Sequence, residues 1–305
     1  MAAFLLRRLL HGFVVLWVVA TLTFFLLRFA PGGPFDRERK LPPEVLANIE
    51  AKYHLDEPVL TQYAHYLQGI FRGDLGPSYK YLDRGVNEII ADTLPTSALL
   101  GGLALLFALI LSFPIGLSAA YFRNSWIDRS GMLGATLGIS VPHFILGALL
   151  IWLFALQLGW LQAGRWDQWS SAILPMITLG AAPAAYLSAL LRSSLLETFG
   201  EDFIRTARAK GMSEIAVVLK HALRHSLIPV LTVMGPLTAA LLTGSFVVEY
   251  VFAIPGMGRF FITAVTDRDY PLIMGVTLVY TVLLVGSNLL VDLFYGYVDP
   301  RIRTA

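Results

Sequence analysis

The chain has 305 residues, of which 56% are hydrophobic and only 14% are charged. Soluble domains carry about a quarter charged residues, so this composition excludes an ordinary soluble protein and indicates one embedded in lipid. The net charge of +2 is too small to indicate a nucleic-acid partner, and the lack of Cys excludes disulfides, thiolate metal sites and Cys nucleophiles.

The first apolar stretch, Leu9–Leu27, directly follows Arg7 and Arg8. A cleaved signal peptide also places cations before an apolar core, but that core is usually about 7 to 15 residues long. The stretch is longer than this. We therefore expect an uncleaved anchor, with residues 1–29 forming the N-terminus and the first membrane span.

Residues 30–92 form a polar segment with helical signals of its own. The proline pair at 42–43 is expected to open a short helix. Asp56 is expected to cap a longer helix that has Pro58 in its first turn and ends at Gly73. The predicted apolar face of that helix consists of Val59, Leu60, Tyr63, Leu67, Ile70 and Phe71. A segment of about sixty residues has a marginal core alone, so we expect it to lie outside the membrane over the mouth of the bundle. Its excess of acidic residues suits a docking partner and a solvated cap equally.

Five further stretches lack Asp, Glu, Lys and Arg and reach the length of about 20 residues that a membrane span requires. They are Thr93–Phe122, Gly131–Trp160, Ser170–Leu191, Ser226–Val248 and Tyr270–Val291. The sequence therefore predicts an all-α integral membrane protein with six transmembrane helices. The last five belong to a core domain over residues 93–305.

Lys and Arg are distributed unevenly among the short loops. With a cytoplasmic N-terminus, the inner loops and ends carry twelve of these residues, whereas the short outer loops carry three, Arg165, Arg259 and Arg268. Positive residues favour the cytoplasmic side of a membrane. We therefore expect both termini, and the basic stretch from Phe203 to Val230, to be cytoplasmic.

That basic stretch is predicted to form two short helices. Asp202 favours a helix start and Gly211 a helix end, and Ser213 is a suitable cap for a second helix. The predicted apolar stripe of the second helix consists of Ile215, Val218, Leu219, Ala222 and Leu223. The small residues Ala207, Ala209 and Gly211 would let another protein approach closely, and the flanking cations would pair with its acidic groups. An ordinary basic loop is an equal alternative.

The stretch "RTARAKG", followed by "VLKHALRHSLIPV", resembles the cytoplasmic signature loop of ABC importer permeases, in the form used by the peptide-type branch. Arg205, Thr206 and Ala207 fall at the E-A-A positions of that signature, and Gly211 falls at its glycine. The general signature has Glu where Arg205 stands and Pro where Arg224 stands, and the peptide-type branch shares both departures. Further stretches are similar to oligopeptide permeases of the B-subunit type, so the resemblance covers nearly the whole chain; they are "LPPEVLANIEAKYHLDEP", "GDLGPS", "GSFVVEYVFAIPGMGRFF", "RDYP" and "DPRIR".

This resemblance implies the type I ABC importer permease fold in a bacterial inner membrane. The helix before the glycine would be a coupling helix that docks on an ATP-hydrolysing subunit, within a loop at about 196–225. The implied coupling residues are Arg205, Thr206, Ala207, Arg208, Ala209, Lys210, Gly211 and Met212. The implied partners are a homologous second permease, two ATP-binding subunits, a periplasmic or lipid-anchored peptide-binding protein, a short peptide substrate and membrane lipid.

The chain contains no G-x-x-x-x-G-K-[ST] phosphate-binding motif. We therefore expect ATP and Mg²⁺ to bind to partner subunits, and we expect neither a cofactor nor catalysis on this chain. Oligopeptides are the expected cargo, and dipeptides, murein peptides and nickel chelates are the alternatives. An intramembrane enzyme and an ion-coupled transporter are further alternatives, against which the charge-free spans argue.

Four more polar residues attract attention. His143, beside Pro142 in the third span, suits a pathway-lining role or an interhelical hydrogen bond. Glu249, at the end of the fifth span, is a candidate for an outer gate or the pathway, or an interfacial acid at a helix end. His221 and His225 lie one helical turn apart without an evident third ligand, so we expect no metal site.

Overall fold

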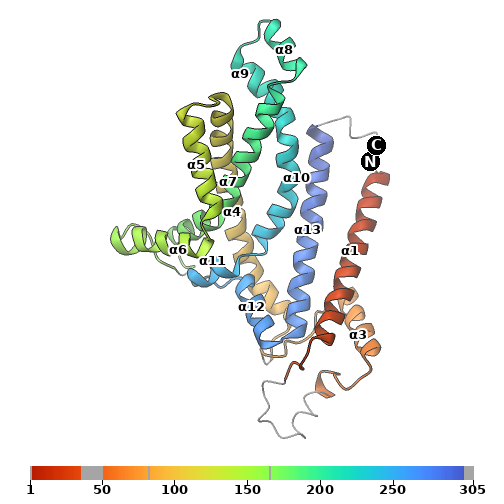
Figure 1. The fold of residues 1–305 in the computed structure, drawn as a ribbon. Helices are drawn as coiled ribbons and strands as arrows, with labels where there is room; N and C mark the ends of the chain where they lie inside the picture. Colours follow the sequence, from red (N-terminus) through yellow and green to blue (C-terminus); the bar gives the residue numbers. More distant parts are fainter. Residues whose placement is uncertain (1, 36–50, 82, 165, 299–305) are drawn as a thin grey trace.

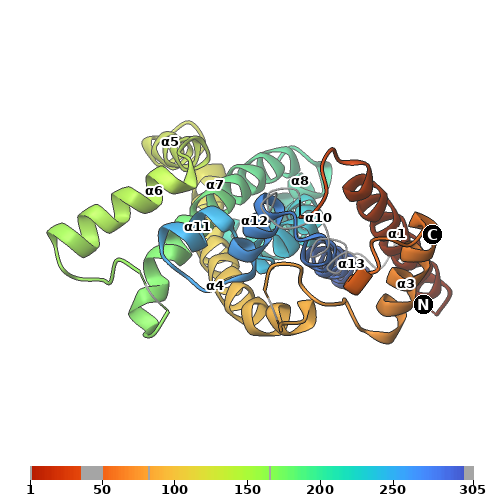
Figure 2. The same ribbon diagram turned by 90° about the horizontal axis from the view of Figure 1, so that it is seen from below.

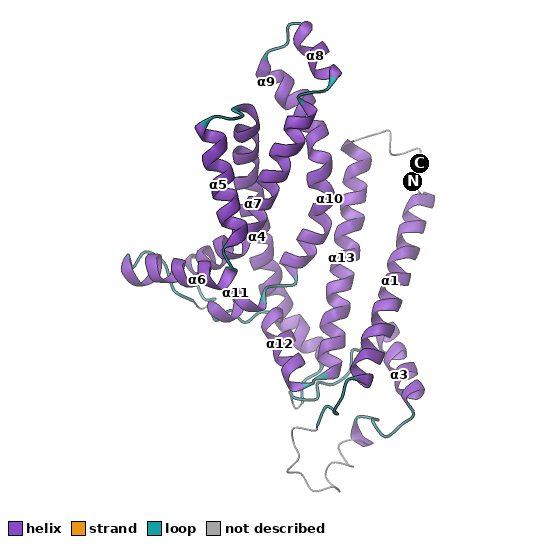
Figure 3. Ribbon diagram, in the orientation of Figure 1, coloured by secondary structure: helices purple, strands orange, loops and turns teal. Residues whose placement is uncertain are grey.

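The computed structural model describes residues 2–35, 51–81, 83–164 and 166–298. These residues are helical apart from loops and one isolated β-bridge between Pro77 and Gly85 (Figures 1 and 3). Five helical stretches are long and apolar enough to cross a membrane, and a bent pair makes six. The prediction of an all-α membrane protein is confirmed. The short helix predicted to start at the proline pair 42–43 lies outside the described residues.

The straight spans form an elongated bundle (Figure 1). They are α1 (Ala2–Phe29), α4 (Val86–Tyr121), α7 (Ile173–Thr198), α10 (Leu223–Leu242) and α13 (Tyr270–Val298). Helix α4 packs along α7, α10 packs along α13, and α1 lies at the edge of the bundle against α13 (Figure 2). Ala104 and Ala108 of α4 and Ala184 of α7 are buried. Small side chains of this kind let helices in lipid approach closely.

The third predicted span is not a single helix, so that prediction was wrong. Helix α5 (Trp126–Ser140) is followed by α6 (His143–Leu150), which continues into the π-helix η2 (Ile151–Gln157), and the two parts meet at 106°. Pro142 stands at the bend. Proline lacks an N–H donor and disfavours a helical conformation in the residue before it, so the helix stops there. Helices α6 and η2 consequently project sideways from the bundle (Figures 1 and 2).

The fifth predicted span, Ser226–Val248, ends earlier than expected. Helix α10 stops at Leu242, and a short break leads into α11 (Phe246–Val251) and α12 (Met257–Asp267). In the break, Gly244 has φ 87°, in the left-handed region that residues with a Cβ rarely adopt. We call residues 246–267 the α11–α12 hairpin.

Helix α3 (Val59–Arg72) lies beside α1 at the edge of the bundle (Figure 2). The structure describes only part of residues 30–92, so the expectation that this segment lies outside the membrane over the mouth of the bundle stays a prediction. The Tyr63 hydroxyl is 2.6 Å from the hydroxyl of Thr21 on α1. The Tyr66 ring stacks on Phe24 of α1, with centroids 5.6 Å apart. Aromatic packing therefore anchors this segment to the first span.

The ends and the apolar face of α3 agree only in part with those predicted from the sequence. Gly73 ends the helix as predicted, with φ 74°. The predicted Asp56 cap was wrong, because Pro58 holds the N-cap position and no side chain makes a capping hydrogen bond there. Two residues of the predicted apolar face, Leu60 and Phe71, are 72% and 73% exposed.

The two ends of the bundle carry different elements. The N-terminal end of α1 and the C-terminal end of α13 lie at the same end as the short helices that follow α7 (Figure 1). Helix α3 and the α11–α12 hairpin lie toward the opposite end. There, the buried carboxylate of Asp269 accepts hydrogen bonds from the Ser78 hydroxyl and, at 3.1 Å, from the Tyr79 N–H. These bonds fasten the segment before α4 to the start of α13.

Candidate functional site

The basic stretch forms a helical hairpin beyond the end of α7 (Figure 1). Helix α8 (Asp202–Ala209) is followed by a turn, by α9 (Glu214–Ala216) and by the π-helix η4 (Val217–Ala222), which runs directly into α10. We call residues 199–222 the α8–α9 hairpin. It projects past the neighbouring helix ends, so α8 protrudes from this end of the bundle.

Local signals set the turn of the hairpin as predicted. Gly211, just after α8, has φ 78°, and the Ser213 hydroxyl accepts a hydrogen bond from the Ala216 N–H at 3.4 Å. Arg208 reaches across the turn, and its Nε and Nη2 atoms donate to the two carboxylate oxygens of Glu214 at 2.9 and 3.1 Å. This bidentate ion pair holds the two short helices together.

Ala207 lies inside the hairpin. It is 5% exposed, and Ile204 and Val217 are 0% exposed. All three belong to one apolar cluster with Leu195 of α7, against which the half-buried Met212 packs. The small side chain of Ala207 therefore serves the internal packing of the hairpin, and its expected contribution to the approach of another protein stays a prediction.

The exposed face of α8 and its C-cap carries Arg205, Thr206, Ala209 and Lys210. Arg205 contacts Asp202 one turn earlier at 3.2 Å. An exposed helical pair of this kind contributes only about 0.3–0.5 kcal/mol, so Arg205 can readily exchange this partner for another. This face combines positive charge with a small side chain, which suits an acidic surface on another protein.

The predicted apolar stripe of the second helix was wrong in part. Val218 and Ala222 are buried as predicted, but Ile215 and Leu219 are 72% and 52% exposed, and Val217 takes their place inside. The reason is the π-helix η4, whose i→i+5 hydrogen bonds shift side chains away from a 3.6-residue period. Ile215 and Leu219 instead line an apolar groove of about 360 Å³ beside the end of α4.

Two polar contacts join α7 to the neighbouring helices α5 and α10 near the hairpin. Asp128 of α5 is 3% exposed and accepts hydrogen bonds from Nε and Nη2 of Arg192 on α7 at 2.6 and 2.8 Å. The Ser226 hydroxyl donates to the Thr198 hydroxyl at 2.9 Å. The ion pair escaped prediction because both residues lie just outside the charge-free stretches. The sequence does contain a signal for this ion pair, because Arg192 directly follows an apolar span and a charge at such a position requires a partner.

His143 makes the interhelical hydrogen bond that was one of its two predicted roles, with Nδ1 3.0 Å from the carbonyl oxygen of Thr178 on α7. Glu249 on α11 is 0% exposed, and its predicted role at an outer gate or in the pathway, like the alternative of an interfacial acid at a helix end, stays a prediction. The His225 ring lies 4.7 Å from that of Phe203. Within the described residues, no three His, Cys, Asp or Glu side chains gather as metal ligands.

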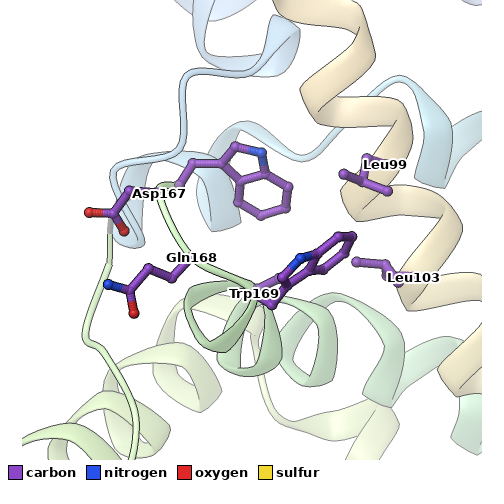
Figure 4. A pocket seen from close by; sticks show the side chains of 7 residues that line it. Leu99, Leu103, Asp167, Gln168 and Trp169 are labelled. Atoms are coloured by element: carbon purple, nitrogen blue, oxygen red, sulfur yellow. The ribbon is translucent and has the colours of Figure 1, made fainter.

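A small cavity lies at the opposite end of α7 from the hairpin (Figure 4). It has a volume of about 200 Å³ and lies between α4 and the segment leading into α7. The indole of Trp169 points toward Leu99 and Leu103 of α4, whereas Asp167 and Gln168 point away from these leucines. The lining is mainly apolar and aromatic, so it offers a binding surface without an arrangement of reacting groups.

Known families match nearly all of this chain. The family described as the inner membrane component of binding-protein-dependent transport systems matches residues 112–304, and the N-terminal part of such membrane components matches residues 1–100. The chain belongs to this permease family. The permease is 44% identical to the oligopeptide transport system permease protein OppB of Haemophilus influenzae, over 99% of this chain and 100% of that protein. It is 45% identical to the dipeptide transport system permease protein DppB of Bacillus subtilis, over 99% of this chain and 98% of that protein. It is 43% identical to OppB of Escherichia coli K12, over 99% of this chain and 100% of that protein.

Solved structures share the fold of the permease. A chain of the MetNI methionine ABC transporter, in an inward-facing conformation, matches with a TM-score of 0.55 and 19% identity, over 69% of the permease and 96% of that chain. A chain of an amino acid ABC transporter matches with a TM-score of 0.51 and 18% identity, over 68% of the permease and 92% of that chain. At these identities the likeness concerns the fold alone. The predicted ABC importer permease fold is confirmed.

Proposed function

We propose that this permease is the membrane-embedded subunit of an ATP-driven importer of oligopeptides. The observation that carries the proposal is a protruding basic hairpin on a chain that aligns end to end with oligopeptide and dipeptide permeases. A homologous second permease completes the translocation pathway. A periplasmic or lipid-anchored binding protein delivers the peptide at the end of the bundle opposite the hairpin.

In this proposal the α8–α9 hairpin docks on one of two ATP-hydrolysing subunits. Arg205, Thr206, Ala209 and Lys210 provide the contact surface, and Arg208, Gly211, Ala207 and Met212 keep the hairpin in shape. The hairpin follows α7 and runs directly into α10, so a displacement of α8 reaches two spans. ATP and Mg²⁺ bind to the partner subunits, and the permease converts their movement into a change of the pathway.

The hairpin end of the bundle is proposed to face the cytoplasm of a bacterial cell, with the permease in the inner membrane. The excess of Lys and Arg in the loops of this end supports the orientation. The ends of α1 and α13 lie at the same end as the hairpin, which supports cytoplasmic termini as well.

Reconstitution tests the cargo. The permease is placed in proteoliposomes with its second permease, the ATP-hydrolysing subunits and the binding protein, and uptake of an oligopeptide, a dipeptide, a murein peptide and a nickel chelate is compared. We expect ATP-dependent uptake that is fastest for the oligopeptide. Faster uptake of another cargo moves the assignment to that cargo, and uptake that is independent of ATP contradicts the proposal.

A bulky substitution tests the docking surface. Ala209→Trp places a large ring on the exposed face of α8, and Ala64→Trp places the same ring on the exposed face of α3 as the matched control. We expect Ala209→Trp to reduce copurification of the ATP-hydrolysing subunits, because docking needs close approach at this face. Ala64→Trp should leave it unchanged. Equal copurification by the two variants would refute the docking surface.

A further inference from the structure

Glu249 combines complete burial with uncharged hydrogen-bond partners. It lies on α11 at 0% exposure, and the Ser97 hydroxyl of α4 donates to its Oε1 at 2.7 Å. The backbone N–H of Arg259, on α12, donates to its Oε2 at 3.0 Å. Burial of a carboxylate is costly unless its oxygens are hydrogen-bonded, so the contacts around Glu249 must be closely matched to it.

The hydrogen bonds of Glu249 and Ser97 cap the start of α12. Besides donating to Glu249, the Ser97 hydroxyl accepts a hydrogen bond from the Met257 N–H at 2.8 Å. Met257 and Arg259 belong to the first turn of α12, whose N–H groups have no partner within the helix. The N-cap residue, Gly256, has no side chain to supply one. A carboxylate also suits this position because the N-terminal end of a helix dipole is positive.

The backbone around the carboxylate is shaped to receive it. A Cβ on Gly256 would lie 2.4 Å from the Cδ of Glu249, and a Cβ on Gly244 would lie 2.0 Å from its Oε1. Only glycine fits at these two positions. Gly244 also lines an apolar cavity of about 370 Å³, together with Phe261 of α12 and Tyr280 of α13. The carboxylate therefore lies directly behind a residue that lines this cavity.

We propose that Glu249 is a positioning residue that locks the α11–α12 hairpin to α4. Its hydrogen bonds join three elements, because Ser97 belongs to α4, the carboxylate to α11 and the two N–H groups to α12. The hairpin, its cavity wall and this part of α4 consequently move as one body during transport. The transport readout of this inference rests on the proposed function, whereas the lock itself is tested without it.

Thiol accessibility tests the lock in the full chain, which contains no Cys. Met257→Cys places a thiol where the side chain is 1% exposed, and it leaves the backbone N–H that takes part in the lock. Ala108→Cys, at a position of 0% exposure elsewhere on α4, is the control. We expect Glu249→Ala to speed alkylation of Met257→Cys by about tenfold and to leave Ala108→Cys protected, because a detached first turn opens locally.

Continued protection of Met257→Cys in the Glu249→Ala background overturns the proposal. If labelling rises at both positions, the bundle has loosened generally, and Ser97→Ala decides the question because it removes a single hydroxyl. A rise confined to Met257→Cys in the Ser97→Ala background supports the lock. Any other result with Ser97→Ala overturns it.

Coupling in the reconstituted complex tests the role of the lock in transport. Glu249→Gln keeps the shape of the side chain without the charge, and Glu249→Asp keeps the charge. We expect Glu249→Gln to hydrolyse ATP while uptake of peptide falls, and Glu249→Asp to recover part of the uptake. A parallel loss of hydrolysis and uptake, or Glu249→Asp no better than Glu249→Gln, overturns the positioning role. An unaltered complex that fails to import peptide contradicts the proposed function, and the thiol result still stands.

Discussion

Gly211 offers a test of the proposed docking role of the α8–α9 hairpin that can be separated from effects on general stability. Gly211 and Gly73 have φ values of 78° and 74°, and a Cβ at either position would meet no atom within 4 Å. An Ala substitution therefore acts through the backbone alone. The left-handed conformation costs about 1–2 kcal/mol for a residue with a Cβ, so Gly211→Ala and Gly73→Ala should lower stability by similar amounts.

The two substitutions should differ in docking. A cost of 1–2 kcal/mol at the turn reduces the population of the native hairpin shape by about 5–30-fold relative to distorted ones. We expect the affinity of the ATP-hydrolysing subunit for the permease in nanodiscs to fall, by at most that factor, for Gly211→Ala and to stay unchanged for Gly73→Ala. Equal affinities for the two variants, despite equal shifts in Tm, would refute the reasoning.

Three further predictions test the packing, through the free energy of unfolding and through proteolysis. Asp128→Asn leaves Arg192 without its counter-charge and should cost about 3 kcal/mol, and adding Arg192→Met should recover part of this; strictly additive losses would argue against the pair. Ala207→Leu overfills the hairpin core and should cost about 1–3 kcal/mol. Ala209→Leu, on the exposed face, should change stability by less than about 0.5 kcal/mol, and equal effects at the two alanines would contradict the burial of the first. Phe24→Ala removes the ring on which α3 stacks, should cost about 3–5 kcal/mol, and should expose α3 to proteolysis before the bundle; simultaneous cleavage would contradict a separate anchor.

Features that depend on local chain chemistry were predictable from the sequence. A span requires only apolar length, so each predicted span has a helical counterpart in the structure. The turn of the α8–α9 hairpin depends on Gly211 and Ser213, which act through their own backbone and through a residue three positions away. Gly73 ends α3 by the same means.

Features that depend on distant partners were not predictable. Glu249 is hydrogen-bonded to a hydroxyl 152 positions away, and Asp128 pairs with an arginine 64 positions away. Pro142 was visible in the sequence, but the direction of the bend depends on the packing of α6 against α7 and α11. Ile215 and Leu219 were assigned to the wrong face because a 3.6-residue period does not anticipate a π-helix.

Cross-linking from the tip of the α8–α9 hairpin tests most directly whether the hairpin contacts an ATP-hydrolysing subunit. Lys210→Cys introduces the sole thiol of the chain on an exposed residue, and Trp169→Cys does so at an exposed position at the other end of α7. With a thiol-reactive photo-cross-linker in the active complex, we expect Lys210→Cys to capture the ATP-hydrolysing subunit, with a yield that changes on addition of ATP. Capture from Trp169→Cys, or none from Lys210→Cys, would show that the hairpin is not the coupling element.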